Sequence, residues 1–327
     1  MGSFRVMSSD RLPARNVMPV CILLSVHNGA AFLDALLQSL GQQTHAAWQL
    51  VWRDDGSTDH SAQIVRRFAD NLPTGRCVQV TRSVERLGVA GSFGLLLDHV
   101  PDGHLAAFCD QDDVWFPDKL ERAVNALAPF HATNEPALYC SRQMLTDSAI
   151  ARLGLSPALP PEPAFPMALT QNIATGCTIM LSPAAIRLVR AAMPPPAGTL
   201  HDWWSYLLVT GAGGHVVTDN QPTLYYRQHQ SNVVGAPAHF AARARAALRR
   251  GPALFMSTFR ANVTQLLRHG DLLTDPAVAR LGRLRQALDI PGPAGCLARW
   301  RLLRTMPEMR RSTRAEQMIF RLWFVLG

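Results

Sequence analysis

Residues 105–120 read LAAFCDQDDVWFPDKL, and this stretch decides the fold. An apolar run, Leu105–Cys109, ends abruptly in three carboxylates, Asp110, Asp112 and Asp113. A proline follows at position 117, near the first turn of a segment whose apolar residues have helical spacing. The pattern predicts a buried strand that carries acids at its carboxyl end and leads into a helix. In open α/β sheets, ligands bind at that edge.

The acids at alternate positions, Asp110 and Asp112, are suited to hold a divalent cation against a diphosphate. Mg²⁺ and Mn²⁺ prefer oxygen ligands and share them with substrate phosphates. The alternative is a solvated acidic turn that caps the helix at Pro117. One Asp-x-Asp tripeptide proves little by itself. The order of hydrophobic strand, acids, aromatic pair, Pro-Asp and helix favours the metal-binding interpretation.

Composition indicates a folded protein in a reducing compartment. Of the 327 residues, 48% are hydrophobic and 17% are charged, which is enough for a large core and argues against disorder. None of the six cysteines forms a C-x-x-C pair, so we expect free thiols and no zinc site. They stand at positions 21, 77, 109, 140, 177 and 296.

The sequence predicts a cytoplasmic protein, or one attached to the inner face of the cell membrane. Its first 19 residues are polar and mixed, without the apolar core of a signal peptide. No stretch reaches the roughly 18 apolar residues that a membrane span requires.

Charge is distributed unevenly along the chain. Residues 236–327 contain 16 Arg, no Lys and 5 acidic residues, a net charge of +11, whereas residues 1–235 carry −3. This asymmetry predicts a boundary near Gly235. We therefore expect a flexible leader over residues 1–18, a folded domain over 19–235 and a basic helical region over 236–327.

The first half of the folded domain alternates strands and helices. Four predicted strands and three helices within about ninety residues indicate an α/β fold with a doubly wound, mostly parallel sheet. The predicted strands are Val20–Val26, Trp48–Trp52, Cys77–Thr81 and Leu105–Cys109. Polar clusters follow three of them and should converge on one edge. Further on we expect strands at 137–141, 175–182, 215–219 and 223–229, helices at 183–193 and 201–209, and a Pro-rich loop at 154–166.

Six motifs together resemble the family 2 glycosyltransferases, most closely the rhamnosyltransferase-like branch of bacterial surface-polysaccharide (O-antigen) synthesis. The resemblance covers roughly residues 19–235. The motifs are SVHNG at 25–29, DDGSTD at 54–59, LGVAGSF at 87–93, DQDDVW at 110–115, HDWW at 201–204 and YRQH at 226–229.

The resemblance implies a GT-A fold, a nucleotide-sugar donor, Mn²⁺ or Mg²⁺, and inversion at the anomeric carbon. Residues 19–235 would form the nucleotide-sugar-binding catalytic domain. Asp110 and Asp112 match the metal-binding motif, and Asp202 matches the general base. Rhamnose is one candidate sugar, and the acceptor would be a glycan or lipid-linked. The residues implied in nucleotide binding are Ser25, His27, Asn28, Asp54, Asp55, Gly88 and Asp110, with Asp55 the better match to the acid that contacts the base.

Two of these residues have alternative interpretations. The acceptor hydroxyl must lose a proton to a carboxylate, and Asp202 fits because the adjacent Trp203 and Trp204 can partly desolvate it and stack on a sugar ring. Alternatively, Asp202 only caps a helix that begins at Trp203. His229 either completes the metal shell or binds the diphosphate, or it is satisfied by a backbone carbonyl.

The basic region allows two interpretations. Arg-rich amphipathic helices with Trp and Phe are typical of segments that lie on an anionic membrane surface. The alternative is a helical subdomain packed on the catalytic domain, or an oligomer contact. Nothing in this region matches a nucleic-acid-binding module.

Two competing functions use the same acids. A metal-dependent nucleotidyl- or phosphoryl-group enzyme would need a phosphate-binding Gly loop with a Lys, or a second cluster of metal ligands, and the sequence contains no G-x-x-x-x-G-K-[ST]. A protein that binds a nucleotide sugar without catalysis would not need the set Asp110, Asp112 and Asp202.

Overall fold

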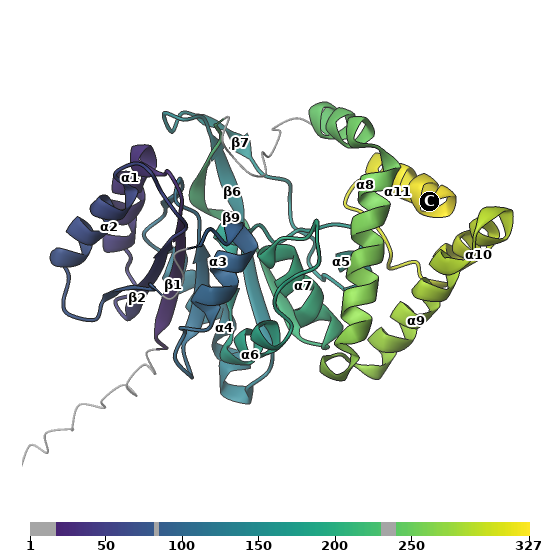
Figure 1. Ribbon diagram of the computed structural model, residues 1–327, viewed down its shortest axis with the longest axis horizontal. Coiled ribbons are helices and arrows are strands. Elements are labelled where there is room, and N and C mark those ends of the chain that lie inside the picture. The colour runs from purple at the N-terminus through teal and green to yellow at the C-terminus, as the bar shows by residue number, and fades with distance from the viewer. Residues whose placement is uncertain (1–17, 82–84, 230–239) are drawn as a thin grey trace, which may run out of the picture.

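The computed structural model describes residues 18–81, 85–229 and 240–327, with the backbone alone for residues 240–251. The predicted leader, residues 1–18, lies outside these residues apart from Met18, and so does the predicted boundary near Gly235. Figure 1 shows a sheet flanked by helices, with a group of C-terminal helices on one side of it.

Within the described ranges, nine strands form one sheet in the order β3-β2-β1-β4-β8-β6-β9-β5, and β7 pairs with β6. Six of them, β1 to β4, β6 and β9, run in the same direction, so the predicted mostly parallel α/β sheet is confirmed. The strands are β1 (Val20–Val26), β2 (Trp48–Asp54), β3 (Cys77–Gln79), β4 (Leu105–Cys109), β5 (Val114–Trp115), β6 (Ala137–Thr146), β7 (Arg152–Leu155), β8 (Met180–Leu181) and β9 (His215–Arg227).

The central strands are apolar because both faces of the sheet are covered. Alternate residues of β1 enter two different hydrophobic clusters: Cys21 and Leu23 face one, and Ile22 and Leu24 face the other. Helices α1, α2 and α4 pack on the second cluster, and α3, α6 and α7 on the first. These helices are α1 (Ala30–Gly41), α2 (Ser61–Asp70), α3 (Gly88–Leu97), α4 (Lys119–Thr133), α6 (Pro183–Ala191) and α7 (His201–Gly211).

Beyond β4 the sheet departs from the sequence-based prediction. The strand expected at 175–182 is a 3₁₀ turn, η1 (Gly176–Thr178), followed by the two-residue β8, which runs antiparallel between β4 and β6. The strands expected at 215–219 and 223–229 are one strand, β9, because a register shift opposite Ser141 and Arg142 absorbs the irregular residues before Pro222. The Pro-rich loop is shorter than predicted, since β7 and α5 (Phe165–Ala168) occupy its two ends.

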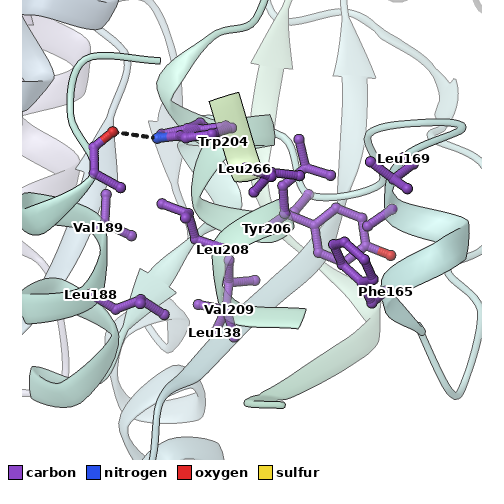
Figure 2. Close-up of a cluster of buried hydrophobic side chains, with 14 of the residues drawn as sticks. Leu138, Phe165, Leu169, Leu188, Val189, Trp204, Tyr206, Leu208, Val209 and Leu266 are labelled. Atoms are coloured by element: carbon purple, nitrogen blue, oxygen red, sulfur yellow. Dashed lines mark hydrogen bonds between the residues drawn. The ribbon is translucent and has the colours of Figure 1, made fainter. Parts of the chain in front are cut away.

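The C-terminal helices share a hydrophobic core with the sheet domain. They are α8 (Phe240–Arg268), η2 (Gly270–Leu272), α9 (Asp275–Asp289), α10 (Gly292–Thr305) and α11 (Arg314–Leu326). Figure 2 shows Leu266 of α8 beside Trp204 and Tyr206 of α7. Phe259 and Val263, which the sequence places on one helical face, are buried in this core. The region is thus helical, and it packs on the domain that precedes it.

Candidate active site

Four polar segments meet at the edge where the parallel strands end. Three of them follow β1, β2 and β4, and the fourth follows β9. The first turn of α7 also reaches this edge, since Asp202 Oδ2 accepts a hydrogen bond from Gly176 N (3.2 Å) and the next residue, Cys177, has its ligand atom within 4.8 Å of that of Asp110. The convergence expected from the sequence is therefore present in the fold.

The loop after β1 is held by side chains from its two neighbours. The Gln111 side chain accepts a hydrogen bond from His27 N (2.8 Å) and donates one to His27 O (3.0 Å). Asn28 has a φ of +50°, and its Oδ1 accepts from Thr58 N at 2.8 Å. At Gly29 an added Cβ would lie 2.4 Å from Gln111 Oε1, so only glycine fits without displacing that side chain.

Of the residues predicted to bind the nucleotide, Ser25 and His27 are half-buried and Asn28 is exposed. His27 Nδ1 is buried and makes no hydrogen bond within the described part of the chain. Ser25 lies near the end of β1, opposite Arg53 of β2. The structure places the three at the end of β1 and in the loop that follows it, where Asn28 also serves to fix that loop.

Asp55 fixes the start of α3 to the end of β2. Its carboxylate is 3% exposed and accepts hydrogen bonds from Leu87 N (2.7 Å) and Gly88 N (2.8 Å). The buried Arg53 guanidinium lies 3.3 Å from Asp55 Oδ1. The neighbouring Asp54 accepts from Ser57 N at 2.9 Å. Asp54, Asp55 and Gly88 therefore meet, as the motif pattern predicts, and Asp55 has a structural role that the sequence did not reveal.

The second acid of the loop after β4 contacts the end of β9. Asp112 Oδ2 lies 2.8 Å from His229 Nε2. The His229 ring stacks on Phe32 with 4.7 Å between ring centroids, and Arg227 donates from Nε to Asp112 O at 2.8 Å. Two of the three predicted metal ligands are thus in direct contact, although 117 residues separate them.

The other two acids of this loop lie beside a cysteine. Asp110, Asp113 and Cys177 place ligand atoms within 4.8 Å of one another, the only such group of His, Cys or acidic side chains found in the described ranges. Burial and the negative charges of Asp112 and Asp202 raise the pKa of Asp110 to about 7. Burial, together with Asp112 and Asp110, raises the pKa of Asp113 well above its ordinary value. Both carboxyl groups therefore take up a proton more readily than an ordinary aspartate.

Asp202 is a buried carboxylate inside the first turn of α7. The helix begins at His201 and not at Trp203, and its N-cap is Leu200, which has no capping side chain. Asp202 Oδ1 accepts a hydrogen bond from Trp203 N (2.7 Å), as the capping interpretation expects, and Oδ2 accepts from Asn172 Nδ2 (3.0 Å) and Gly176 N (3.2 Å). Burial nevertheless raises the pKa of Asp202 to about 6, against these hydrogen bonds, which lower it. The carboxyl group of Asp202 can therefore exchange a proton near neutral pH.

The prediction that both tryptophans can stack on a sugar is wrong for Trp204. Trp204 is fully buried in the core, and its Nε1 donates to Ala192 O at 2.9 Å. Trp203 is half-buried and donates to Ala168 O, so it alone of the pair retains an exposed part. The reason is the helical period, which turns adjacent residues of α7 in different directions.

Two further residues at the site were not predicted to have a role, although His201 is the first residue of the HDWW motif. Asn172 belongs to none of the motifs and reaches Asp202 only through the fold. His201 stacks on Phe93 at 4.0 Å, and burial lowers its pKa to about 3, so that its imidazole is neutral.

The fold and the acidic edge define a glycosyltransferase of the GT-A class. Residues 21–141 match the family model "Glycosyl transferase family 2", and this part of the chain is a domain of that family. The dTDP-rhamnosyl transferase RfbG of Shigella flexneri is 27% identical over 233 residues, which cover 67% of this chain and 76% of RfbG.

Two other comparisons agree with this assignment. Escherichia coli WfgD, a UDP-Glc:alpha-D-GlcNAc-diphosphoundecaprenol beta-1,3-glucosyltransferase, is 26% identical over 138 residues, covering 42% of this chain and 51% of WfgD. The crystal structure of S. aureus TarS 1-349 in complex with UDP-GlcNAc has the same fold. It aligns with a TM-score of 0.56 and 14% identity over 94% of this chain and 88% of TarS 1-349. The glycosyltransferase class predicted from the motifs is confirmed.

The buried pair Arg53–Asp55 gives a stability prediction. Asp55→Asn leaves a buried guanidinium without its counter-charge, so we expect the free energy of unfolding in urea to fall by about 3 kcal/mol. Asp289→Asn is the matched control, because its ion pair with Arg285 (2.7 Å) is exposed and should contribute less than about 1 kcal/mol. Equal losses in the two variants would contradict a structural role for Asp55.

Proposed function

We propose that this enzyme transfers a sugar, with inversion, from a nucleotide-sugar to a glycan or lipid-linked acceptor in bacterial surface-polysaccharide synthesis. One observation carries the proposal. Asp110 and Asp202, 92 residues apart in the sequence, both lie against the turn η1: Gly176 N donates to Asp202 Oδ2 at 3.2 Å, and the ligand atoms of Cys177 and Asp110 lie within 4.8 Å of each other. Glycosyl transfer needs two such groups: one beside the departing diphosphate, and one beside the incoming hydroxyl.

The donor would occupy the edge formed by the loops after β1, β2 and β4. We assign the nucleotide to Ser25, His27, Asn28, Asp54, Asp55 and Gly88, and the diphosphate to the vicinity of Asp110. RfbG, similar over two thirds of this chain, is a dTDP-rhamnosyl transferase, which makes dTDP-rhamnose the first donor to test. WfgD acts on a diphosphoundecaprenol-linked sugar, which supports a lipid-linked acceptor.

Asp110, Asp112 and His229 would hold Mn²⁺ or Mg²⁺. Carboxylate oxygens and a neutral imidazole suit these cations. Burial and the charges of neighbouring acids raise the pKa values of Asp110 and Asp113, and a bound divalent cation would offset both effects by favouring the ionised carboxylates. When bound, the cation would neutralise charge on the nucleoside diphosphate as it departs.

Asp202 would accept the proton of the acceptor hydroxyl. Asn172 and Gly176 N orient its Oδ2, and burial keeps it basic enough to take a proton near neutral pH. Attack by a hydroxyl on the side of the anomeric carbon opposite the diphosphate inverts that carbon.

Nucleotide release is the direct measurement of this function. We expect the protein to release nucleoside diphosphate from at least one of dTDP-rhamnose, UDP-glucose, UDP-GlcNAc and GDP-mannose with a glycan acceptor and Mn²⁺ or Mg²⁺. EDTA should reduce the rate by about a hundredfold or more, because the charge of the leaving group is then unopposed. Full turnover in EDTA would contradict the metal assignment.

The general base is tested by Asp202→Asn, which keeps the size of the side chain but cannot take a proton. We expect transfer to fall roughly a hundredfold or more while donor affinity stays the same. Since burial raises the pKa of Asp202 to about 6, the wild-type kcat should fall as pH drops below 6, and the variant should lose this dependence. The exposed Asp98→Asn is the control. A wild-type rate in Asp202→Asn would move the base elsewhere, with Asp113 the next candidate.

We propose further that the protein attaches to an anionic membrane surface through α11. Within the described residues, no helix has both the length and the apolarity to cross a bilayer. Met318, Leu322 and Leu326 lie four residues apart on the outside of α11 and are 73%, 57% and 65% exposed. Arg314 and Arg321 flank this apolar row and are also exposed. A basic, apolar helix surface of this kind suits the boundary of an anionic leaflet.

Membrane attachment is tested by Leu322→Asp in the full chain. We expect binding to phosphatidylglycerol-containing vesicles to fall several-fold in a sedimentation assay, because a carboxylate cannot enter the lipid boundary and is repelled by it. Leu153→Asp is the matched control, since Leu153 on β7 is 51% exposed and lies outside the helical region. High salt should weaken wild-type binding by screening. Equal binding of both variants would reject the proposal.

A further inference from the structure

The only lysine of the chain is buried beside the acidic loop. Lys119 is the first residue of α4 and is 3% exposed, although lysine is almost never fully buried unless it is paired. Its Nζ donates to Cys177 O at 2.8 Å and lies 4.6 Å from the centre of the Trp115 ring. The other basic side chains, counted without histidine, are all arginine. A buried lysine in a chain whose other cationic side chains are arginine leads us to ask what Lys119 contributes to the site.

Lys119 carries the positive charge that faces the acids from inside the protein. Burial lowers its pKa to about 8, against the negative charges of Asp113 and Asp110, which raise it. In return, its charge lowers the pKa of Asp110. The side chain is thus largely an ammonium ion at neutral pH, and it stabilises the loop that carries Asp110.

The carbonyl that Lys119 holds belongs to the turn that supports Asp202. Cys177 is the middle residue of η1, and the preceding Gly176 donates its N–H to Asp202 Oδ2 at 3.2 Å. There is little free space at this turn, since a Cβ on Gly176 would lie 3.1 Å from His201 Nε2 and 3.6 Å from Asp202 Cβ. A shift of η1 would therefore move the hydrogen bond that orients Asp202.

We propose that Lys119 is a positioning residue for sugar transfer, which fixes η1 through the Cys177 carbonyl and thereby holds Asp202 in place relative to the acidic loop. The inference rests on the proposed function, because it assigns Lys119 to the same reaction. Lys119 does not touch donor or acceptor in this role. It joins the half of the site that faces the diphosphate to the half that receives the proton.

The test uses Lys119→Met, which keeps an unbranched apolar side chain as far as the ε position and removes the ammonium. We expect kcat to fall at least about tenfold, while the affinity for dTDP with Mn²⁺, measured by calorimetry, changes less than about threefold. Turnover is measured with whichever of the four donors above reacts fastest. Val124→Ala, a core change on the same helix, is the control: it should lower the melting temperature and leave kcat near wild type.

A double-mutant cycle separates positioning from mere stabilisation. If Lys119 acts through Asp202, then Lys119→Met should cost less than about twofold when added to Asp202→Asn, since no base remains to be positioned. A purely structural effect would lower turnover by the same factor in both backgrounds, and that result would overturn the proposal.

The outcomes also distinguish this inference from the proposed function. Wild-type kcat in Lys119→Met, with Asp202→Asn inactive, overturns the role of Lys119 alone. Wild-type kcat in Asp202→Asn overturns both assignments. If Lys119→Met does not fold, Lys119→Gln is measured in its place. The amide nitrogen of glutamine lies one bond short of the position of the lysine Nζ, so it cannot make the hydrogen bond to Cys177 O. The same loss of kcat is expected there, and an unchanged kcat overturns the proposal.

Discussion

Burial of β1 and β4 on both faces is the constraint on which the rest of the structure depends. A strand covered by helices on each side cannot carry carboxylates along its length, because a buried charge without a partner is too costly. The first position at which β4 can carry an acid is therefore the residue after Cys109, and Asp110 stands there. β1 is buried in the same way, and its polar residues likewise follow it, in the loop His27–Gly29. The hydrophobic core thus confines the polar side chains to one edge of the sheet.

Hydrogen bonds between neighbouring loops fix the conformation of that edge. Side chains from one loop satisfy the backbone of the next, as Gln111 does for His27 and Asp55 for Gly88. Residues of the motifs thus hold the loops together through hydrogen bonds of their side chains. Asp202 follows the same principle, because its position depends on Asn172 and on the turn at Gly176.

Sequence predicted the parts of this protein that local pattern controls. The strands Val20–Val26 and Leu105–Cys109 were located to the residue, since continuous apolar runs have clear ends. The strand predicted at 175–182 is too long, because only Met180 and Leu181 pair in the sheet, and two residues carry too little periodicity to show their bounds or their antiparallel direction. The roles of Asn172 and Lys119 depend on contacts made 30 and 58 residues away along the chain, and no local spacing encodes such contacts.

Because the chain contains a single lysine, chemical labelling of that residue can report local opening of the structure. Amine-directed reagents meet no accessible lysine side chain while α4 and η1 stay closed, because Lys119 is covered. Its modification therefore requires that this part of the molecule open, and the rate of labelling would measure the free energy of that opening. Bound donor or acceptor should slow the labelling if either one stabilises the closed arrangement.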